Sequence, residues 1–368
     1  MMSKTFVISG INGQLGQFLA KHLQNNHLDI QIIGTLRHKS YDNQPYIFDK
    51  SKVIFELMDL SDSHSIENLI SEYKPDYFVN AAATAQISES WKLPIQQFEI
   101  NTLAVIHQLE SIKKYSPLTR YLNCGSMDEL DSDNTKSQNE ETRINPKSPY
   151  ACSKSAARYL VNTYKNAYKL YAIQPWLGNF ESELRSEKYV SKKISLSVAR
   201  INHAINNKLP FLSLELGNIY AVRNFQSCED VCDAVWKMLN QELYWSDKGD
   251  WDYIVSRIKS YVVSNSDSHS IKDMVELSFR ATGIEGVWVG SGLEEKFIIP
   301  DYLRDICDIK SSILVKVNKD LFRPSDINYI NGDASSIKLD LNWKPTLSFE
   351  ELVSKLVKYE VDNYKNNN

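Results

Sequence analysis

The N-terminal segment contains the feature that most constrains the fold: a short apolar run, Thr5–Ile8, that ends at a glycine. Two more glycines follow at three-residue steps, and an amphipathic segment with apolar residues at helical spacing begins there. In such a turn the first glycine permits the bend, the second lets backbone amides approach a pyrophosphate, and the third allows close helix–strand packing. The alternative is a tight turn without a ligand. The residues expected to contact a dinucleotide are Gly10, Asn12, Gly13, Gln14, Leu15 and Gly16.

The end of the second expected strand, residues 30–36, indicates which dinucleotide fits. It is followed by Arg37, His38 and Lys39, and the next carboxylate is Asp42. A carboxylate at this place would bind a free ribose 2′-hydroxyl, whereas a basic cluster accommodates a 2′-phosphate. Arg37 can form a charge-assisted fork on such a phosphate. The pattern therefore favours NADP over NAD, the alternative being solvated loop cations.

Apolar runs alternate with helical patterns from residue 4 to about 176, which predicts an α/β fold with a doubly wound parallel sheet. Further strands are expected at 53–58, 77–80, 120–124 and 171–175, and helices at 63–73 and about 95–115. The second helix should carry Ile100, Leu103, Ile106 and Leu109 along one face. Four more cofactor contacts are expected after the third and fourth strands: Asp59, Leu60, Ala82 and Ala83.

Two units are expected. Residues 1–176, with a later segment of about 218–263, should form the dinucleotide-binding unit, and residues 177–217 and 264–368 mainly a smaller lobe. The stretch from Trp288 to Pro324 has no clear periodicity and is expected to be loop-rich. A lobe beyond the carboxyl ends of a parallel sheet is where a substrate is usually held.

Composition excludes several classes of partner. The net charge of −4 over 368 residues gives no reason to expect a nucleic acid or a membrane as partner. No apolar run approaches the ~20 residues that span a bilayer, and Phe6–Ile8 is too short for a signal peptide. Five scattered cysteines are typical of reduced thiols in a cytoplasmic protein. Cys228 and Cys232 are interpreted as packing residues, so no metal site is expected.

The candidate chemistry follows the fifth expected strand. Ser126 lies just after that strand, and a helix that begins near Ser148 carries Tyr150 and Lys154 four residues apart, on one face. A lysine ammonium beside a phenol favours the phenolate, which moves a pKa of ~10 toward neutrality. Tyr150 is therefore a candidate general acid/base for an alcohol oxygen that Ser126 also binds. Alone, a Tyr-x-x-x-Lys pair would be a coincidence more often than not, but here it follows a dinucleotide-binding pattern.

With these residues the sequence resembles the extended short-chain dehydrogenase/reductase family, and most of all the GDP-mannose 4,6-dehydratases. The resemblance covers nearly the whole chain. It includes the glycine turn and the following motifs: Asn80-Ala-Ala-Ala, Asn101, Ser148-Pro-Tyr-Ala-x-x-Lys154, Asn179-x-Glu181-Ser182, Tyr189-Val-Ser-Lys-Lys193-Ile, Leu216-Gly217-Asn218 with Arg223 and Asp230, Phe322-Arg323-Pro324, Gly332-Asp333 and Asn342-Trp343-Lys344-Pro345.

The resemblance implies a GDP-linked sugar as substrate. Asn179, Lys193, Arg223 and Arg323 match positions that hold the nucleotide diphosphate or its sugar, and Arg323 is the one most expected to be buried against phosphate. Arg185 matches a position that touches NADP across a subunit contact, which implies a homodimer or homotetramer. The implied reaction oxidises C4, removes the C5 proton and the C6 hydroxyl, and returns the hydride to C6, giving a 4-keto-6-deoxy sugar.

The departures from the family pattern fall at the reacting centre. The family's Thr-Ser-Glu is Ser126-Met127-Asp128 here, and a carboxylate pulled back by ~1 Å can lower a rate by ~10²-fold. Gln86, Trp91, Phe180 and Leu184 also replace expected residue types. Three hypotheses stay open: a dehydratase in which Asp128 is the C5 base, acting on a hexose or a heptose; a 4-ketoreductase that uses only Ser126, Tyr150, Lys154 and NADPH; and a cofactor-binding protein without catalysis.

Overall fold

The structure, a computed structural model, describes residues 4–38, 45–133, 137–265, 267–300, 313–322, 325 and 327–367. The chain divides into two units. Unit 1 comprises Met1–Gly178, Cys228–Ser266 and Gly332–Lys344, and unit 2 comprises Asn179–Ser227, Asp267–Asn331 and Pro345–Asn368.

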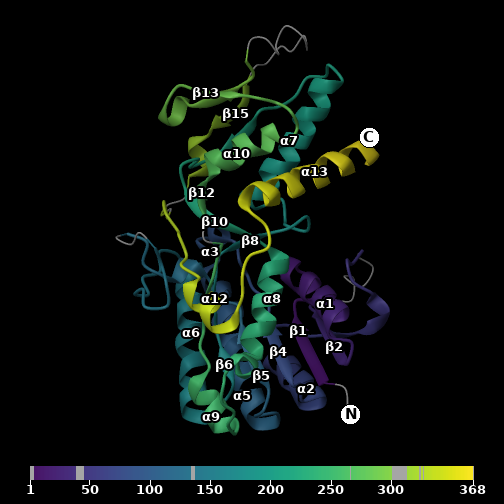
Figure 1. Cartoon of the computed structure of the whole chain (residues 1–368), viewed down its shortest axis with the longest axis vertical. Helices are drawn as coiled ribbons and strands as arrows, with labels where there is room; N and C mark the ends of the chain where they lie inside the picture. The colour runs from purple at the N-terminus through teal and green to yellow at the C-terminus, as the bar shows by residue number, and fades with distance from the viewer. Residues whose placement is uncertain are drawn as a thin grey trace. The chain divides into compact units, whose positions relative to one another are not determined.

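Unit 1 is built on a six-stranded parallel sheet in the order β3-β2-β1-β4-β5-β6 (Figure 1). The order reverses on either side of β1, so the predicted doubly wound α/β fold is confirmed. Its strands are β1 (Lys4–Ser9), β2 (Ile30–Leu36), β3 (Val53–Leu57), β4 (Tyr77–Asn80), β5 (Arg120–Asn123) and β6 (Ala172–Ile173). A further parallel pair joins β7 (Trp176–Leu177) and β11 (Val262–Val263).

Helices cover both faces of this sheet. The helices of unit 1 are α1 (Gln14–Asn26), α2 (Ser63–Tyr73), α3 (Ile87–Ser90), α4 (Pro94–Phe98), α5 (Ala104–Tyr115), α6 (Pro149–Tyr168), α8 (Cys228–Leu239), α9 (Trp251–Arg257) and α12 (Ser335–Leu341). α1 packs beside α8, whereas α2, α5 and α6 lie side by side (Figure 1). β1 follows the alternation of a strand buried on both faces, because Val7 belongs to the core under α2, α5 and α6 while Phe6 points the other way and stacks on Tyr77.

The expected helix over about 95–115 is interrupted. Between α4 and α5 the chain forms one π-helical segment, Glu99–Leu103, in which the hydrogen bonds span five residues instead of four. The extra residue rotates the apolar face, so Leu103 is 48% exposed while Leu109 is fully buried. The prediction that both leucines share one buried face is therefore wrong. A 3.6-residue periodicity that is continued through a π segment assigns the residues beyond that segment to the wrong face of the helix.

Unit 2 has its own sheets and core. A three-stranded sheet has the order β12-β10-β8, and a four-stranded sheet has the order β13-β14-β15-β9. The strands are β8 (Asn179–Glu181), β9 (Leu214–Leu216), β10 (Val222–Ser227), β12 (Ser268–Ser270), β13 (Val287–Val289), β14 (Lys296–Ile298) and β15 (Ile313–Val317). The helices are α7 (Val190–Asn206), α10 (Ile271–Arg280) and α13 (Phe349–Asn367), and they pack on one another (Figure 1).

The stretch expected to be loop-rich contains three strands of this second sheet. β13, β14 and β15 pair in an antiparallel arrangement, with a register shift between Phe297 and Ile298. Two of these strands have only three residues each, which is too short for an alternating pattern to stand out in the sequence. The expectation of an irregular segment is therefore wrong for its described part.

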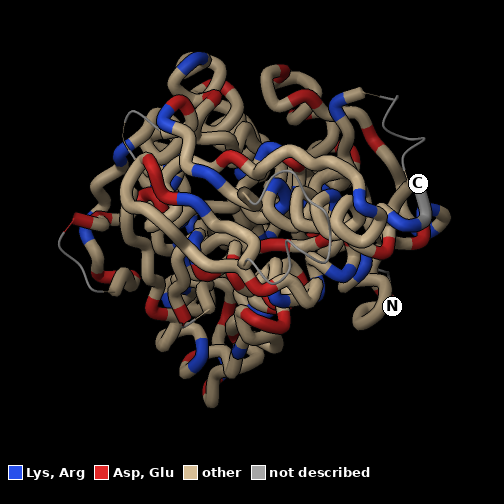
Figure 2. The backbone as a smooth tube through the Cα atoms, turned by 90° about the horizontal axis from the view of Figure 1, so that it is seen from above, with Lys and Arg blue, Asp and Glu red and all other residues tan. Residues whose placement is uncertain are grey.

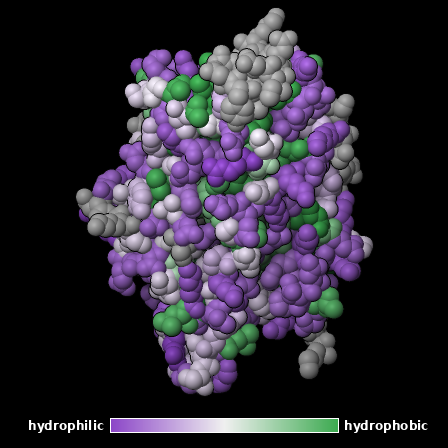
Figure 3. All heavy atoms as spheres, turned by 45° about the horizontal axis from the view of Figure 1, so that its top comes forward, coloured by the Kyte–Doolittle hydropathy of each residue, from purple (hydrophilic) through white to green (hydrophobic). Residues whose placement is uncertain are grey.

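The surface carries charges of both signs. Lys and Arg segments are interspersed with Asp and Glu segments along the described chain (Figure 2). The face in Figure 3 is mostly hydrophilic, with hydrophobic residues scattered over it. Among the described residues, no helix is both long enough and apolar enough to cross a membrane.

Candidate active site

The glycine turn after β1 has the geometry that its sequence predicts. Gly10 has a φ of +73°, and a Cβ there would lie 2.9 Å from the Cβ of Ala82. A Cβ at Gly16 would lie 2.3 Å from the carbonyl oxygen of Gly10 and 2.7 Å from the Cα of Ile11. The first glycine therefore makes the bend and passes close to the segment after β4, and the third lets α1 pack on β1.

The N-terminus of α1 is suited to an anion. Gly13 is its N-cap residue and is exposed, no side chain caps the helix, and its first turn contains no acidic residue. Asn12 is held by its carbonyl oxygen, which accepts a hydrogen bond from Gln17 at 3.2 Å. Gln14 is half-buried and Leu15 is buried in the core. The helix dipole and the backbone of this turn therefore face outward without a competing carboxylate.

Replacing Gly16 by Ala is expected to destabilise unit 1 by about 1–3 kcal/mol, because the new methyl group meets two backbone groups that cannot move aside. Lys21→Ala on the same helix is the control and should stay within about 0.5 kcal/mol of the wild type. Urea unfolding followed by circular dichroism measures both. A Gly16→Ala variant as stable as the Lys21→Ala variant would contradict the close packing of α1 on β1.

Around the end of β2 the expected cofactor residues have different environments. Arg37 is exposed. The Asp59 carboxylate accepts hydrogen bonds from the amide and hydroxyl of Ser61 at 2.9 and 2.7 Å. These bonds lower the pKa of Asp59, and the positive charge of Arg37 acts in the same direction. Leu60 is buried in the core, Ala82 lies against Gly10, and Ala83 is exposed. Lys39 and Asp42 lie outside the described residues.

The segment after β4 is fixed by the π segment. Asn101 accepts a hydrogen bond from the amide of Thr84 at 3.1 Å and donates one to its carbonyl oxygen at 3.0 Å. Asn101 also donates to the hydroxyl of Ser153 on α6 at 3.2 Å. The segment that carries Ala82 and Ala83 is therefore tied to the helix that carries the candidate acid/base.

Ser126 and Asp128 belong to one turn directly after β5. Ser126 caps a 3-10 helix, Met127–Glu129, and its hydroxyl accepts a hydrogen bond from the Asp128 amide at 3.2 Å. The same hydroxyl donates to the Asp128 carboxylate at 3.3 Å. Asp128 is half-buried and Ser126 is buried. The turn therefore presents a hydroxyl and a carboxylate side by side.

Tyr150 and Lys154 lie on α6, which begins with a strong helix start. Ser148 caps the helix through the Ala151 amide at 3.1 Å, and Pro149 occupies the first helical position. Lys154 is 3% exposed and donates to the carbonyl oxygen of Cys124 at 2.8 Å. Burial lowers the pKa of the Lys154 ammonium, because desolvation disfavours its charged form. The helix is thus held against the end of β5, two residues before Ser126.

Sequence reasoning missed a polar network that links the ends of four strands. Ser9 donates to Asn80 at 2.9 Å, Asn80 to Asn123 at 2.9 Å, and Asn123 to Gln174 at 2.7 Å. All four side chains are buried. A signal was present, because each is a polar residue at or just after the end of an apolar strand run. These hydrogen bonds between neighbouring strands fix the relative positions of the strand ends next to the candidate site.

The predicted substrate residues belong to unit 2. Asn179 is the first residue of β8 and pairs in register with Phe225. Lys193 donates to the carbonyl oxygen of Glu215 at 2.7 Å, and burial lowers its pKa. Arg223 is buried and donates to the carbonyl oxygen of Val222 at 2.8 Å. Arg323 lies outside the described residues.

Arg185, expected to touch NADP, has partners within its own unit. Its Nε lies 3.2 Å from the buried carboxylate of Glu181, and its guanidinium stands 3.6 Å from the ring centroid of Tyr189. Burial raises the pKa of Glu181. The arginine is 17% exposed in this arrangement, so a contact with a ligand would use its remaining edge.

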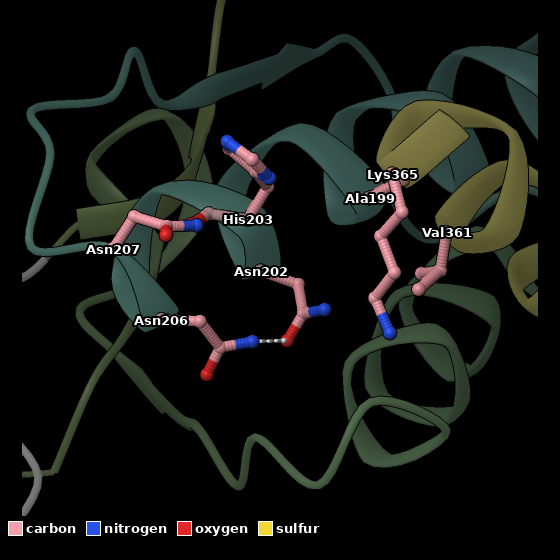
Figure 4. Close-up of a pocket in the computed structure, with 7 residues that line it drawn as sticks. All are labelled: Ala199, Asn202, His203, Asn206, Asn207, Val361 and Lys365. Carbon is pink, nitrogen blue, oxygen red and sulfur yellow. Dashed lines mark hydrogen bonds between the residues drawn. The ribbon is translucent and has the colours of Figure 1, made fainter. Parts of the chain in front are cut away.

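A small pocket of about 190 Å³ lies elsewhere in unit 2, between α7 and α13 (Figure 4). It is lined by Ala199, Asn202, His203, Asn206, Asn207, Val361 and Lys365. Asn206 donates to Asn202, one turn earlier on α7, at 3.2 Å. None of the predicted site residues is among those that line it.

The fold and the Tyr-Lys helix define the class of the chain. Three features together are typical of an extended short-chain dehydrogenase/reductase. They are a parallel sheet in this order, a glycine turn after β1, and a buried lysine four residues after a tyrosine on α6. Within that class, the family model described as GDP-mannose 4,6 dehydratase matches residues 7–356. The chain therefore belongs to the GDP-mannose 4,6 dehydratase family, which is a family of enzymes.

Curated relatives agree with this family. The chain is 28% identical to GDP-mannose 4,6 dehydratase of Drosophila melanogaster, over 99% of this chain and 88% of that protein. It is 29% identical to GDP-mannose 4,6 dehydratase 1 of Arabidopsis thaliana, over 98% of this chain and 90% of that protein. It is 26% identical to GDP-mannose 4,6-dehydratase of Vibrio cholerae, over 98% and 95% respectively.

Solved structures share the fold at lower identity. The chain is similar to dTDP-glucose 4,6-dehydratase from Bacillus anthracis in complex with NAD, with a TM-score of 0.73, 18% identity and 98% of each chain covered. It is also similar to RMD from Pseudomonas aeruginosa complexed with NADPH, with a TM-score of 0.69, 18% identity, and 98% and 99% covered.

Proposed function

We propose that this protein catalyses the NADP-dependent 4,6-dehydration of a GDP-hexose resembling GDP-mannose, giving a GDP-4-keto-6-deoxy sugar. Family membership supports the reaction class. The observation that carries the proposal is the fixation of α6 by Lys154 on the Cys124 carbonyl, which holds the Tyr150 helix against the turn of Ser126 and Asp128. A hydroxyl, a carboxylate and a phenol are the groups that this reaction needs.

A dinucleotide fits the residues of unit 1. Gly13 has no side chain, so space remains at the N-terminus of α1, and no side chain caps this helix. A Cβ at Gly10 would lie too close to Ala82, so only glycine fits at the bend. The residues of unit 1 proposed to hold the cofactor are Gly10, Asn12, Gly13, Gln14, Leu15, Gly16, Arg37, Asp59, Leu60, Ala82, Ala83, Tyr150 and Lys154. Arg185, in unit 2, is proposed for the same role. A nicotinamide held by these residues would supply the redox chemistry, as acceptor of a hydride from C4 and donor of it to C6.

The protein's residues move the protons. Tyr150, as phenolate, takes the proton of the C4 hydroxyl, while Ser126 donates a hydrogen bond to the same oxygen. The resulting C4 carbonyl acidifies the C5 proton, which the Asp128 carboxylate takes. The C6 hydroxyl then leaves as water with the proton that Asp128 took. After hydride return C5 takes a proton from solvent, and Tyr150 releases its own proton to solvent, which restores both groups. One water is lost per sugar, with no net oxidation or reduction.

The substrate residues are proposed from their chemistry and their match to the family. Lys193 and Arg223 are cations, and Asn179 offers an amide, as suits a nucleotide diphosphate or its sugar. Arg323 is proposed for the same role.

One incubation tests the proposal. The purified chain receives GDP-mannose with a trace of NADP+, and the products are followed by NMR and by NADPH absorbance. We expect a 4-keto-6-deoxy product with no net NADPH change. If GDP-mannose is untouched but a GDP-4-keto-6-deoxy sugar consumes NADPH in equal amount, the protein is a 4-ketoreductase and the proposal is wrong.

Replacing Arg37 by Ala is expected to weaken NADP binding by about 10–100-fold and to leave NAD binding nearly unchanged, because a hydrogen bond to a charged group contributes about 1.5–3 kcal/mol. Isothermal titration calorimetry measures both cofactors. Lys52→Ala, at another exposed cation of unit 1, is the control. Equal losses for NADP and NAD would remove the argument for a 2′-phosphate contact.

Assembly and location are part of the proposal. Five large apolar side chains between residues 91 and 103 are 38–76% exposed: Trp91, Leu93, Ile95, Phe98 and Leu103. Apolar side chains gathered on one segment are typical of a protein interface, which supports a homodimer or homotetramer. A cytoplasmic location, with neither nucleic acid nor membrane as partner, stays a prediction from the sequence.

A further inference from the structure

A buried ion pair lies directly beneath the candidate site. Glu129 is fully buried and Arg158 is 2% exposed. Their side chains make a fork, with Nε 2.6 Å from Oε2 and Nη2 3.1 Å from Oε1. Taking two charges out of water is costly, and the pair is maintained only when its remaining hydrogen-bonding groups are satisfied. The partners that satisfy them therefore show what the pair holds together.

Glu129 holds the turn. Its Oε1 accepts a hydrogen bond from the Ser126 amide at 2.8 Å, which closes the turn that carries Ser126 and Asp128. The same carboxylate accepts from Gln174 Nε2 at 3.2 Å. Gln174 Nε2 also donates to the carbonyl oxygen of Lys154 at 2.8 Å, so the carboxylate is linked to α6 a second time.

Arg158 holds the helix. Tyr150, Lys154 and Arg158 follow one another at four-residue steps and share one face of α6. Lys154 contacts the end of β5, and Arg158 contacts the turn that follows. Arg158 also donates to the carbonyl oxygen of Gln174 at 2.5 Å, and its guanidinium stacks 3.5 Å from the ring centroid of Trp176.

The backbone at Gly125 is closely surrounded by other atoms and has no room to shift. A Cβ at Gly125 would lie 2.8 Å from Arg158 Nη2 and 2.3 Å from the carbonyl oxygen of Pro175. The chain before the turn therefore runs directly along the guanidinium. Contacts on both sides of Ser126 thus depend on the position of Arg158.

We propose that Glu129 and Arg158 are positioning residues, which set the turn of Ser126 and Asp128 relative to Tyr150 and Lys154. This inference rests on the proposed function, because it concerns the groups assigned to the reaction there. A misplacement of about 1 Å at a reacting group can lower a rate by ~10²-fold. The pair is therefore expected to act mainly on the chemical step, through the placement of Ser126 and Asp128 relative to Tyr150.

Two variants separate positioning from stability. Glu129→Gln keeps an oxygen for the Ser126 amide but leaves the Arg158 charge unpaired, so both stability and kcat should fall. In the double variant Glu129→Gln/Arg158→Met the unpaired charge is gone, so stability should recover while kcat stays at least about tenfold low, with KM near the wild-type value. Recovery of kcat together with stability would overturn the proposal.

The matched control is Glu242→Gln. Glu242 pairs with Arg120 at 2.6 Å, both side chains are 16% exposed, and Arg120 begins β5 at the end opposite to the turn. This variant should lose stability without a change in kcat. A fall in kcat as large as that of Glu129→Gln would show that any weakening of this strand slows the reaction, and would overturn the specific role.

A measurement without substrate keeps the inference separate from the proposed function. Amide hydrogen exchange, read by mass spectrometry on the peptide spanning residues 124–130, should be at least about tenfold faster in Glu129→Gln and in the double variant than in the wild type. Unchanged exchange overturns the positioning role even if the enzyme is a dehydratase. If the variants exchange faster but the wild-type protein does not act on GDP-mannose, the positioning role is upheld and only the proposed function is refuted.

Discussion

Replacing Tyr150 by Phe is expected to lower kcat for the GDP-sugar by about 10²–10⁴-fold, the range that a positioned acid/base contributes. The phenol is 8% exposed, and the ring of Phe fills the same space on α6. NADP binding should fall far less than kcat, because the glycine turn and Lys154 are unchanged. The measurement is product formation followed by NMR, together with a titration of NADP.

Tyr159→Phe is the control for this variant, since Tyr159 lies on the same helix and is 59% exposed. It should retain wild-type turnover. If the Tyr150→Phe variant turned over GDP-sugar as fast as Tyr159→Phe, the phenol would not be the acid/base. If instead the wild type and both variants are inactive toward every GDP-sugar tried but still bind NADP, a cofactor-binding protein without catalysis is the better interpretation.

Replacing Asp128 by Asn should also lower dehydration by about 10²–10⁴-fold, because the amide cannot take the C5 proton. Asn keeps the size of the side chain and an acceptor for the Ser126 hydroxyl, which now donates to the carboxylate at 3.3 Å. The turn should therefore keep its shape. The specific readout is incorporation of solvent deuterium at C5 of the product, which depends on this proton transfer.

Asp133→Asn, in the exposed part of the loop that follows, is the control and should behave as the wild type. Full dehydratase activity in Asp128→Asn would show that this carboxylate only shapes the turn. If neither the variant nor the wild type dehydrates GDP-mannose, and both reduce a GDP-4-keto-6-deoxy sugar equally well, the 4-ketoreductase alternative is favoured.

The sheet could be predicted from the sequence because its inner strands are short apolar runs buried on both faces. Such runs stand out between amphipathic helices, as β1 does between Lys4 and the glycine turn. The π segment at Glu99–Leu103 could not be predicted, because a single extra residue leaves the composition of a helix unchanged. In the stretch of unit 2 expected to be loop-rich, β13 and β14 were missed because each has only three residues.

For the candidate site, the spacing of residues along the sequence was informative, but the packing of side chains could not be inferred from it. Four-residue spacing correctly placed Tyr150 and Lys154 on one helix, and the position after β5 placed Ser126 in a turn. The roles of these residues, and the limits of the two units, stay predictions. Nothing in the sequence pairs Glu129 with Arg158, since residues 29 positions apart meet only after the sheet has formed. Long-range polar contacts of this kind need the fold.

The most direct measurement follows a deuterium label placed at C4 of GDP-mannose. In an internal hydride transfer, the labelled atom leaves C4 and returns to C6 of the same sugar. We expect NMR to find the label at C6 of the 4-keto-6-deoxy product, at close to one deuterium per molecule and without added NADPH. A product with no deuterium at C6, or a label lost to solvent, would contradict internal hydride transfer by this protein.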